Sequence, residues 1–264
     1  MGSVSSSGHP GERRMNDLRI YKDAEKLAAA AAELFVELAQ EAVEARNRFR
    51  VALSGGTTPR RIYELLATPG FSRRIDWARV DTFWGDERYV PADDPESNYR
   101  MTAEALLRHV PVPANNIHRV PTELSPAQAA AEAYEAEIRR CFGEPHSVPR
   151  FDLVYLGLGT NGHTASLFPH SQGLQEKTRL VFADLVAPDK WRISMSVPLL
   201  NQGRTVAFVV AGSEKAEVLR EVLLGERDPE RLPAQLIAPD DPEGKLLWLV
   251  DEAAASLASA PLKG

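Results

Sequence analysis

His163 follows a glycine-rich turn, within the stretch GLGTNGHTASLFP that spans residues 157–169. The apolar run directly before this turn, residues 151–156, has the length and composition of a buried strand. Ligands of open α/β sheets bind at the carboxyl ends of strands, so the turn is a candidate binding site. A histidine placed there can transfer protons near neutral pH, and a hydrogen-bonded structural histidine is the alternative.

Three more polar segments follow predicted strands. They contain, in chain order, Ser54, Gly55, Gly56 and Thr57, then Asp86 and Arg88, then Lys215. Because the carboxyl ends of parallel strands share one edge of a sheet, these segments can converge on the turn that holds His163. A strand, a glycine turn and a helix start in succession can also present backbone N–H groups to a phosphate. Judged singly, each segment equally fits an ordinary turn, a surface ion pair or a solvated lysine.

The composition limits the class of ligand and the surroundings of the protein. With 264 residues, a net charge of -6 and a pI near 5.6, the chain lacks the basic balance that a nucleic-acid partner requires. The single cysteine, Cys141, excludes an internal disulfide and suits a reducing cytoplasm. No apolar run reaches the ~18 residues of a membrane-spanning helix, so no membrane span is expected.

Two other kinds of site find no support in the sequence. The remaining histidines show no paired ligand spacing with His163, which argues against a zinc site. No G-x-S-x-G turn surrounds Ser166, which argues against a serine hydrolase. We therefore predict no metal ligands.

Alternating helices and strands must position the candidate residues. We predict strands over residues 49–53, 80–84, 117–120, 151–156, 191–197, 205–210 and 246–250. We predict helices over residues 23–48, 97–108 and 127–141, one with Thr58 as N-cap and Pro59 in its first position, one ending at Leu224, and one capped by Asp251. This alternation predicts one doubly wound α/β domain over residues 19–264, with a mainly parallel sheet flanked by helices. Residues 1–18 lack the apolar core of a secretory signal and are predicted to be a disordered leader.

Four blocks of residues together resemble the 6-phosphogluconolactonase family. They are LSGGTTP at residues 53–59, WGDERYVP at residues 84–91 with Ser97-Asn98, the stretch at residues 157–169, and Arg192-Ile193. Their order and spacing extend the resemblance from about residue 23 to about residue 257. It implies a fold of the NagB/RpiA/CoA transferase type, no obligatory cofactor, and hydrolysis of 6-phospho-D-glucono-1,5-lactone in the oxidative pentose phosphate pathway.

The resemblance also implies roles for the candidate residues. His163 is expected to be the general base on water, with Asn161 beside it. The sugar phosphate is expected to contact Asp86, Arg88, Arg192, Lys215 and the turn formed by Ser54, Gly55, Gly56 and Thr57. The family usually carries aspartate where this chain has Asn161. If that aspartate tunes the histidine, His163 is here a weaker base; if it only shapes the turn, Asn161 is a fair substitute.

Two rival functions are found on the same fold. Glucosamine-6-phosphate deaminases typically continue after Gly-His with Ile-Ala-Phe-Asn-Glu-Pro, whereas residues 164–169 read Thr-Ala-Ser-Leu-Phe-Pro here. The glutamate that assists ring opening in a deaminase is therefore missing. A non-catalytic sugar-phosphate sensor normally carries a DNA-binding module, and the short polar segment before the first helix is too small for one. The oligomeric state cannot be predicted from the sequence.

Overall fold

A computed structural model describes residues 18–143, 147–239 and 241–258 of the protein. Within these residues, a six-stranded sheet with the order β1-β9-β8-β5-β2-β3 forms the centre of the fold, and every pair of neighbours is parallel. Its strands are β1 (Leu18–Tyr21), β2 (Phe49–Leu53), β3 (Val80–Trp84), β5 (Leu153–Leu156), β8 (Thr205–Val210) and β9 (Lys245–Asp251). This confirms the predicted doubly wound, mainly parallel sheet flanked by helices.

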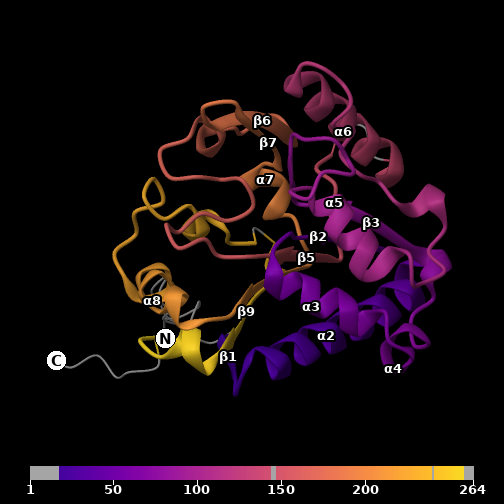
Figure 1. The fold of residues 1–264 in the computed structure, drawn as a ribbon, viewed down its shortest axis with the longest axis horizontal. Coiled ribbons are helices and arrows are strands. Elements are labelled where there is room, and N and C mark those ends of the chain that lie inside the picture. Colours follow the sequence, from indigo (N-terminus) through magenta and orange to yellow (C-terminus); the bar gives the residue numbers. More distant parts are fainter. Residues whose placement is uncertain (1–17, 144–146, 240, 259–264) are drawn as a thin grey trace, which may run out of the picture.

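Helices cover both faces of the parallel sheet, as Figure 1 shows. On one face lie α2 (Ala24–Arg46) and α3 (Thr57–Leu66), which pack with inward side chains such as Tyr155 of β5. On the other face lie α6 (Ala127–Phe142) and α8 (Ala216–Leu224), which share a core with Phe208. Residues of β3, β5 and β8 are buried throughout, which explains why β5 and β8 read as continuous apolar runs.

A second sheet, absent from the prediction, lies beside the first. Its strands are β4 (Asp86–Arg88), β7 (Lys190–Met195) and β6 (Val181–Ala187), and their pairing is antiparallel. The predicted strand over residues 191–197 is β7, and it belongs to this smaller sheet rather than to the parallel one. The polar triplet of β4 gives no local strand signal, because β4 is held by its long-range partner β7.

Short elements complete the fold. They are α4 (Pro69–Ser72), α5 (Asn98–Thr102) with a following π-helical turn (Ala103–Leu107), α7 (Val197–Leu200), α9 (Glu252–Ala255), and 3₁₀ turns at Trp77–Arg79, Ala114–Asn116, Gln172–Gln175, Ser213–Lys215 and Pro233–Leu236. The predicted cap Asp251 is confirmed, since it accepts a hydrogen bond from the Ala254 amide at 2.8 Å. Asp23, predicted as the first residue of the long helix, is instead its N-cap and accepts from the Lys26 amide at 2.8 Å. None of the described helices is long and apolar enough to cross a membrane.

Some boundaries were predicted wrongly. Helix α3 begins at Thr57, with Gly56 rather than Thr58 in the N-cap position. The segment 117–120 is not a strand, and only Ile117 bridges to Thr82 of β3. Of the predicted leader, residues 1–17 lie outside the described residues, and Leu18 begins β1.

Candidate functional site

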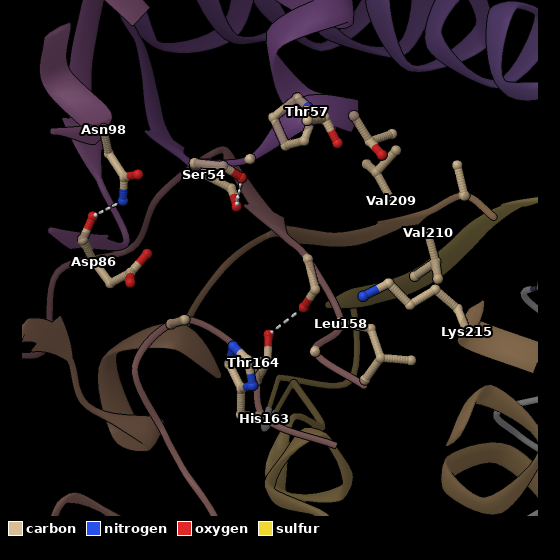
Figure 2. A pocket seen from close by; sticks show the side chains of 18 of the residues that line it. Ser54, Thr57, Asp86, Asn98, Leu158, His163, Thr164, Val209, Val210 and Lys215 are labelled. Carbon is tan, nitrogen blue, oxygen red and sulfur yellow. Dashed lines mark hydrogen bonds between the residues drawn. The ribbon is translucent and has the colours of Figure 1, made fainter. Parts of the chain in front are cut away.

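A cavity of about 300 Å³ opens at the edge of the sheet where β2, β5 and β8 end. It is lined by residues 54–59, Asp86, Arg88, Asn98, residues 157–159, residues 163–165, residues 209–211, Glu214 and Lys215. Figure 2 shows Asp86 and Lys215 on opposite sides of this space, with the imidazole of His163 between them. The structure thus brings together the polar segments that follow separate strands.

Asn161 determines which nitrogen of His163 carries the proton. Its Oδ1 atom lies 2.6 Å from Nδ1 of the imidazole and 3.3 Å from the backbone nitrogen of His163. A backbone N–H can only donate, so the atom it meets is an acceptor, and Nδ1 must donate to the same oxygen. In the neutral ring Nε2 then keeps its lone pair, and it has no hydrogen-bond partner among the described residues.

The ring of His163 is held by packing as well as by hydrogen bonding. It stacks on Phe168 with ring centroids 4.3 Å apart and planes at 23°. A Cβ atom at Gly159 would overlap the imidazole, so glycine is required where this turn crosses the ring. The amide of Gly159 donates to the carbonyl of His163 at 2.8 Å, which closes the turn under the imidazole.

The surroundings of His163 favour its neutral form. Burial is the main cause that lowers its pKa below the ordinary value, and the charges of Lys215, Arg192 and Arg88 lower the pKa further. The carboxylate of Asp86 opposes them. At neutral pH the imidazole is therefore available to accept a proton.

The predicted cations take different positions. Arg88 and Lys215 line the cavity, and Figure 2 shows the amine of Lys215 pointing toward its middle. Arg192 does not line the cavity but lies directly across from Arg88 in the β4–β7 ladder. Burial and the nearby charge of Arg88 lower the pKa of Arg192. Asn161 also lies outside the lining and acts on the cavity through His163.

The start of α3 offers N–H groups to the cavity. No side chain caps this helix, and its N-cap, Gly56, has a φ of 104° that favours glycine. The amides of Gly55, Gly56 and Thr57 have no hydrogen-bond partner within the described residues. The amide of Ser54, by contrast, donates to the hydroxyl of Tyr63 at 2.9 Å and cannot serve a ligand. Within the predicted phosphate-binding turn Ser54–Thr57, the amides of Gly55–Thr57 are therefore the free donors of an anion cradle, at the positive end of a helix dipole.

Two side chains missed by the prediction of site residues complete the cavity wall. Asn98 is buried, donates from Nδ2 to the carbonyl of Asp86 at 2.9 Å, and lies so close to Gly55 that a Cβ there would overlap it. Thr164 donates from its hydroxyl to the carbonyl of Gly157 at 2.8 Å. The contact of Asn98 with Gly55 has no local sequence signal because it joins distant segments, whereas the bond of Thr164 lies within the stretch at residues 157–169.

Asp86 is oriented by the loop after His163. The hydroxyl of Ser166 donates to Oδ2 of Asp86 at 2.7 Å, and this serine is buried. One carboxylate oxygen of Asp86 is thus occupied, while the residue itself lines the cavity. The contact ties β4 to the loop that carries the imidazole.

A cluster outside the cavity combines three residue types that can bind metals. His118, Glu137 and Cys141 place one potential ligand atom each within 4.8 Å of one another. Although burial opposes it, hydrogen bonds to Asp81, Cys141 and Glu137 raise the pKa of His118 to about 10. In the structure these side chains form hydrogen bonds and ion pairs with one another and with Asp81, so this cluster is an ion-pair network. It involves Asp81 near the amino end of β3, away from the cavity.

Comparisons with known proteins agree with this geometry. The model of the family described as glucosamine-6-phosphate isomerases/6-phosphogluconolactonase matches residues 22–248. The 6-phosphogluconolactonase of Synechocystis sp. is 41% identical over 81% of this chain and 86% of its own length. The human 6-phosphogluconolactonase is 37% identical over 93% of this chain and 95% of its own length.

Solved structures extend the likeness to three dimensions. The 6-phosphogluconolactonase from Trypanosoma cruzi superimposes with a TM-score of 0.81 at 28% identity, covering 92% of this chain and 97% of that one. A monomeric glucosamine-6-phosphate deaminase of the NagB superfamily, 20% identical with a TM-score of 0.75 and covering 91% of this chain and 99% of that one, shares the fold. This chain therefore belongs to the family of glucosamine-6-phosphate isomerases and 6-phosphogluconolactonases.

Proposed function

We propose that this chain hydrolyses 6-phospho-D-glucono-1,5-lactone to 6-phospho-D-gluconate in the oxidative pentose phosphate pathway of the cytoplasm. One observation carries the proposal: an imidazole with a free Nε2 shares a cavity with Arg88, Lys215 and the uncapped start of α3. A phosphorylated lactone matches both parts, because its ester carbon accepts activated water and its phosphate suits the cations. Relatives called 6-phosphogluconolactonase support the same reaction.

His163 acts as the general base in this proposal. Its Nε2 takes a proton from water while the water oxygen bonds to C1 of the lactone. The bond between C1 and the ring oxygen then breaks, and the same proton passes from Nε2 to the departing ring oxygen. Asn161 keeps Nδ1 protonated throughout, so the proton moves only at Nε2. The step consumes one water molecule and releases the hydroxy acid.

The phosphate is held at the opposite part of the cavity. The amides of Gly55, Gly56 and Thr57 and the side chains of Arg88 and Lys215 bind its oxygens, because charge-assisted bonds to phosphate are strong. Arg192, paired with Arg88 across the β4–β7 ladder, adds positive charge beside it. Asp86, with one oxygen fixed by Ser166, accepts a hydrogen bond from a sugar hydroxyl.

The oxyanion that forms at C1 needs a donor from the turn after β5. The amides of Gly159 and Gly162 are engaged within the turn, at 2.8 Å and 2.9 Å from their acceptors. Leu158 lines the cavity and its amide has no partner among the described residues, so this amide is the proposed oxyanion donor.

The experiment that tests the proposal compares two reactions of the purified protein. An indicator assay on freshly made 6-phosphogluconolactone should show acid release well above the spontaneous rate. Ammonia release from glucosamine 6-phosphate should be absent, since Phe168 stands where the deaminase continuation carries its glutamate. Ammonia release without lactone hydrolysis would instead establish the deaminase. A protein that does neither but binds 6-phosphogluconate would be the non-catalytic sensor.

A further inference from the structure

Glu87 is a buried carboxylate outside the cavity that the proposed reaction does not use. Glu87 is 2% exposed. Four hydrogen-bond donors surround its carboxylate. Oε1 accepts from the amides of Asn98 at 2.7 Å and Arg88 at 2.8 Å. Oε2 accepts from the amide of Tyr99 at 2.8 Å and the hydroxyl of Ser97 at 3.2 Å. Among the described residues it forms no ion pair, so N–H and O–H dipoles alone balance its charge.

Three of these bonds, from Ser97, Asn98 and Tyr99, fix the start of α5 against β4. The segment held in this way contacts both halves of the proposed phosphate site. The carbonyl of Glu96 accepts from Nη1 of Arg88 at 2.9 Å. Asn98 packs against Gly55, at the beginning of the anion cradle. Displacing this segment would therefore move Arg88 and Gly55 relative to each other.

We propose that Glu87 is a positioning residue that sets the geometry between Arg88 and the Gly55–Thr57 cradle, and thereby the affinity for the phosphate of the substrate. The inference rests on the proposed function, because it assigns the phosphate to this part of the cavity. It differs from a purely structural role in one measurable way. A structural defect would weaken binding and turnover of every lactone, whereas a displaced phosphate site weakens only phosphorylated ligands.

Glutamine is the informative replacement at residue 87. It keeps the shape of glutamate but exchanges one acceptor oxygen for an NH₂ group. That group would face N–H donors, so at least one side of the carboxylate site must open. The segment around Asn98 would shift, while Asn161, His163 and their hydrogen bond would stay in place.

The experiment compares the wild-type protein, Glu87→Gln and the control Glu132→Gln. Glu132 is exposed on α6, so its replacement removes the same charge away from the cavity. In Glu87→Gln we expect KM for 6-phosphogluconolactone to rise about tenfold with kcat little changed. KM for unphosphorylated glucono-1,5-lactone should stay at the wild-type value. Calorimetry with inorganic phosphate should show a matching loss of affinity, and Glu132→Gln should behave like the wild type.

Each outcome decides the inference. An unchanged KM for the phosphorylated lactone in folded Glu87→Gln would overturn it, and so would an equal rise for both lactones. If Glu87→Gln does not fold, Ser97→Ala replaces it, because that variant keeps the carboxylate and removes one of its donors. A phosphate-specific rise in KM then supports the inference, and an unchanged KM overturns it. Failure of the wild type to hydrolyse the lactone would refute the proposed function instead, while the phosphate titration would still test Glu87.

Discussion

Nδ1 of His163 lies 2.6 Å from Oδ1 of Asn161, so a neutral amide stands where the family usually has a carboxylate. The amide fixes the tautomer of the imidazole as a carboxylate would, but it adds no negative charge. The pKa of His163 is lowered, mainly by burial, and no charged partner at Nδ1 offsets this. The imidazole of His163 is thus held in a fixed orientation but is only weakly basic.

Replacing Asn161 separates these two effects. Asn161→Asp should raise the pKa of His163, because a carboxylate at Nδ1 stabilises the imidazolium. The acidic limb of the kcat profile should then move to higher pH, with kcat retained on the plateau. Asn161→Ala should lower kcat by about tenfold or more, because the tautomer is no longer fixed. Equal kcat and identical pH profiles for all three proteins would show that residue 161 only shapes the turn.

Lys215 should affect both the pH profile and substrate binding. Its charge lowers the pKa of His163, so Lys215→Met should raise that pKa and move the acidic limb to higher pH. In the wild type, activity should therefore persist below the ordinary histidine pKa of roughly 6.5 and fall only at lower pH. KM for the phosphorylated lactone should rise in Lys215→Met. Lys245→Met, an exposed change at the start of β9, is the matched control. If Lys215→Met kept the wild-type KM and pH profile, Lys215 would contribute neither to substrate binding nor to the pKa of His163.

Gly159 should tolerate no side chain. The Cβ atom of Gly159→Ala would overlap the imidazole of His163 and push it from its place. A displacement of this kind should lower kcat by about 100-fold, since proton transfer depends on position. Gly70→Ala is the control, because a Cβ there meets nothing within 4 Å. Steady-state kinetics of both variants test this, and near-native kcat in Gly159→Ala would show that the ring can relocate without cost.

Glu87 should make stability depend on pH. Burial raises its pKa to about 7, although three backbone N–H groups oppose the shift. A carboxyl group whose pKa is higher in the folded state contributes stability below its unfolded pKa and loses it as pH rises through the folded pKa. Wild-type stability should therefore fall by about 3 kcal/mol relative to Glu87→Gln between about pH 4.5 and about pH 7. Urea unfolding of both proteins at several pH values measures this difference, and parallel curves would contradict it.

The parallel sheet was predictable because its strands are buried on both faces. Burial on both faces produces apolar runs such as residues 151–156 and 205–210, which are recognisable without any partner. The cap Asp251 was equally predictable, since its bond from the Ala254 amide is local. The polar segments could also be placed at one edge of the sheet, because each of them follows a parallel strand.

The antiparallel sheet and the inner supports of the site were not predictable in the same way. Asp86, Glu87 and Arg88 look like a surface ion-pair group, yet Glu87 is buried because donors from residues 97–99 surround it. The contact between Asn98 and Gly55 joins segments that no periodicity relates. Arg192 does not line the cavity, and it pairs with Arg88 across the β4–β7 ladder. Such relations depend on tertiary packing and leave no local trace.

Hydrolysis of freshly made 6-phosphogluconolactone by wild type and His163→Ala tests the central claim most directly. With the spontaneous rate subtracted and folding checked by circular dichroism, His163→Ala should lose about 10²–10⁴-fold in kcat while still binding 6-phosphogluconate. That result would show that the imidazole activates water. It would also show that the cavity binds the phosphate without the imidazole. A variant that turns over the lactone at close to the wild-type rate would contradict this account.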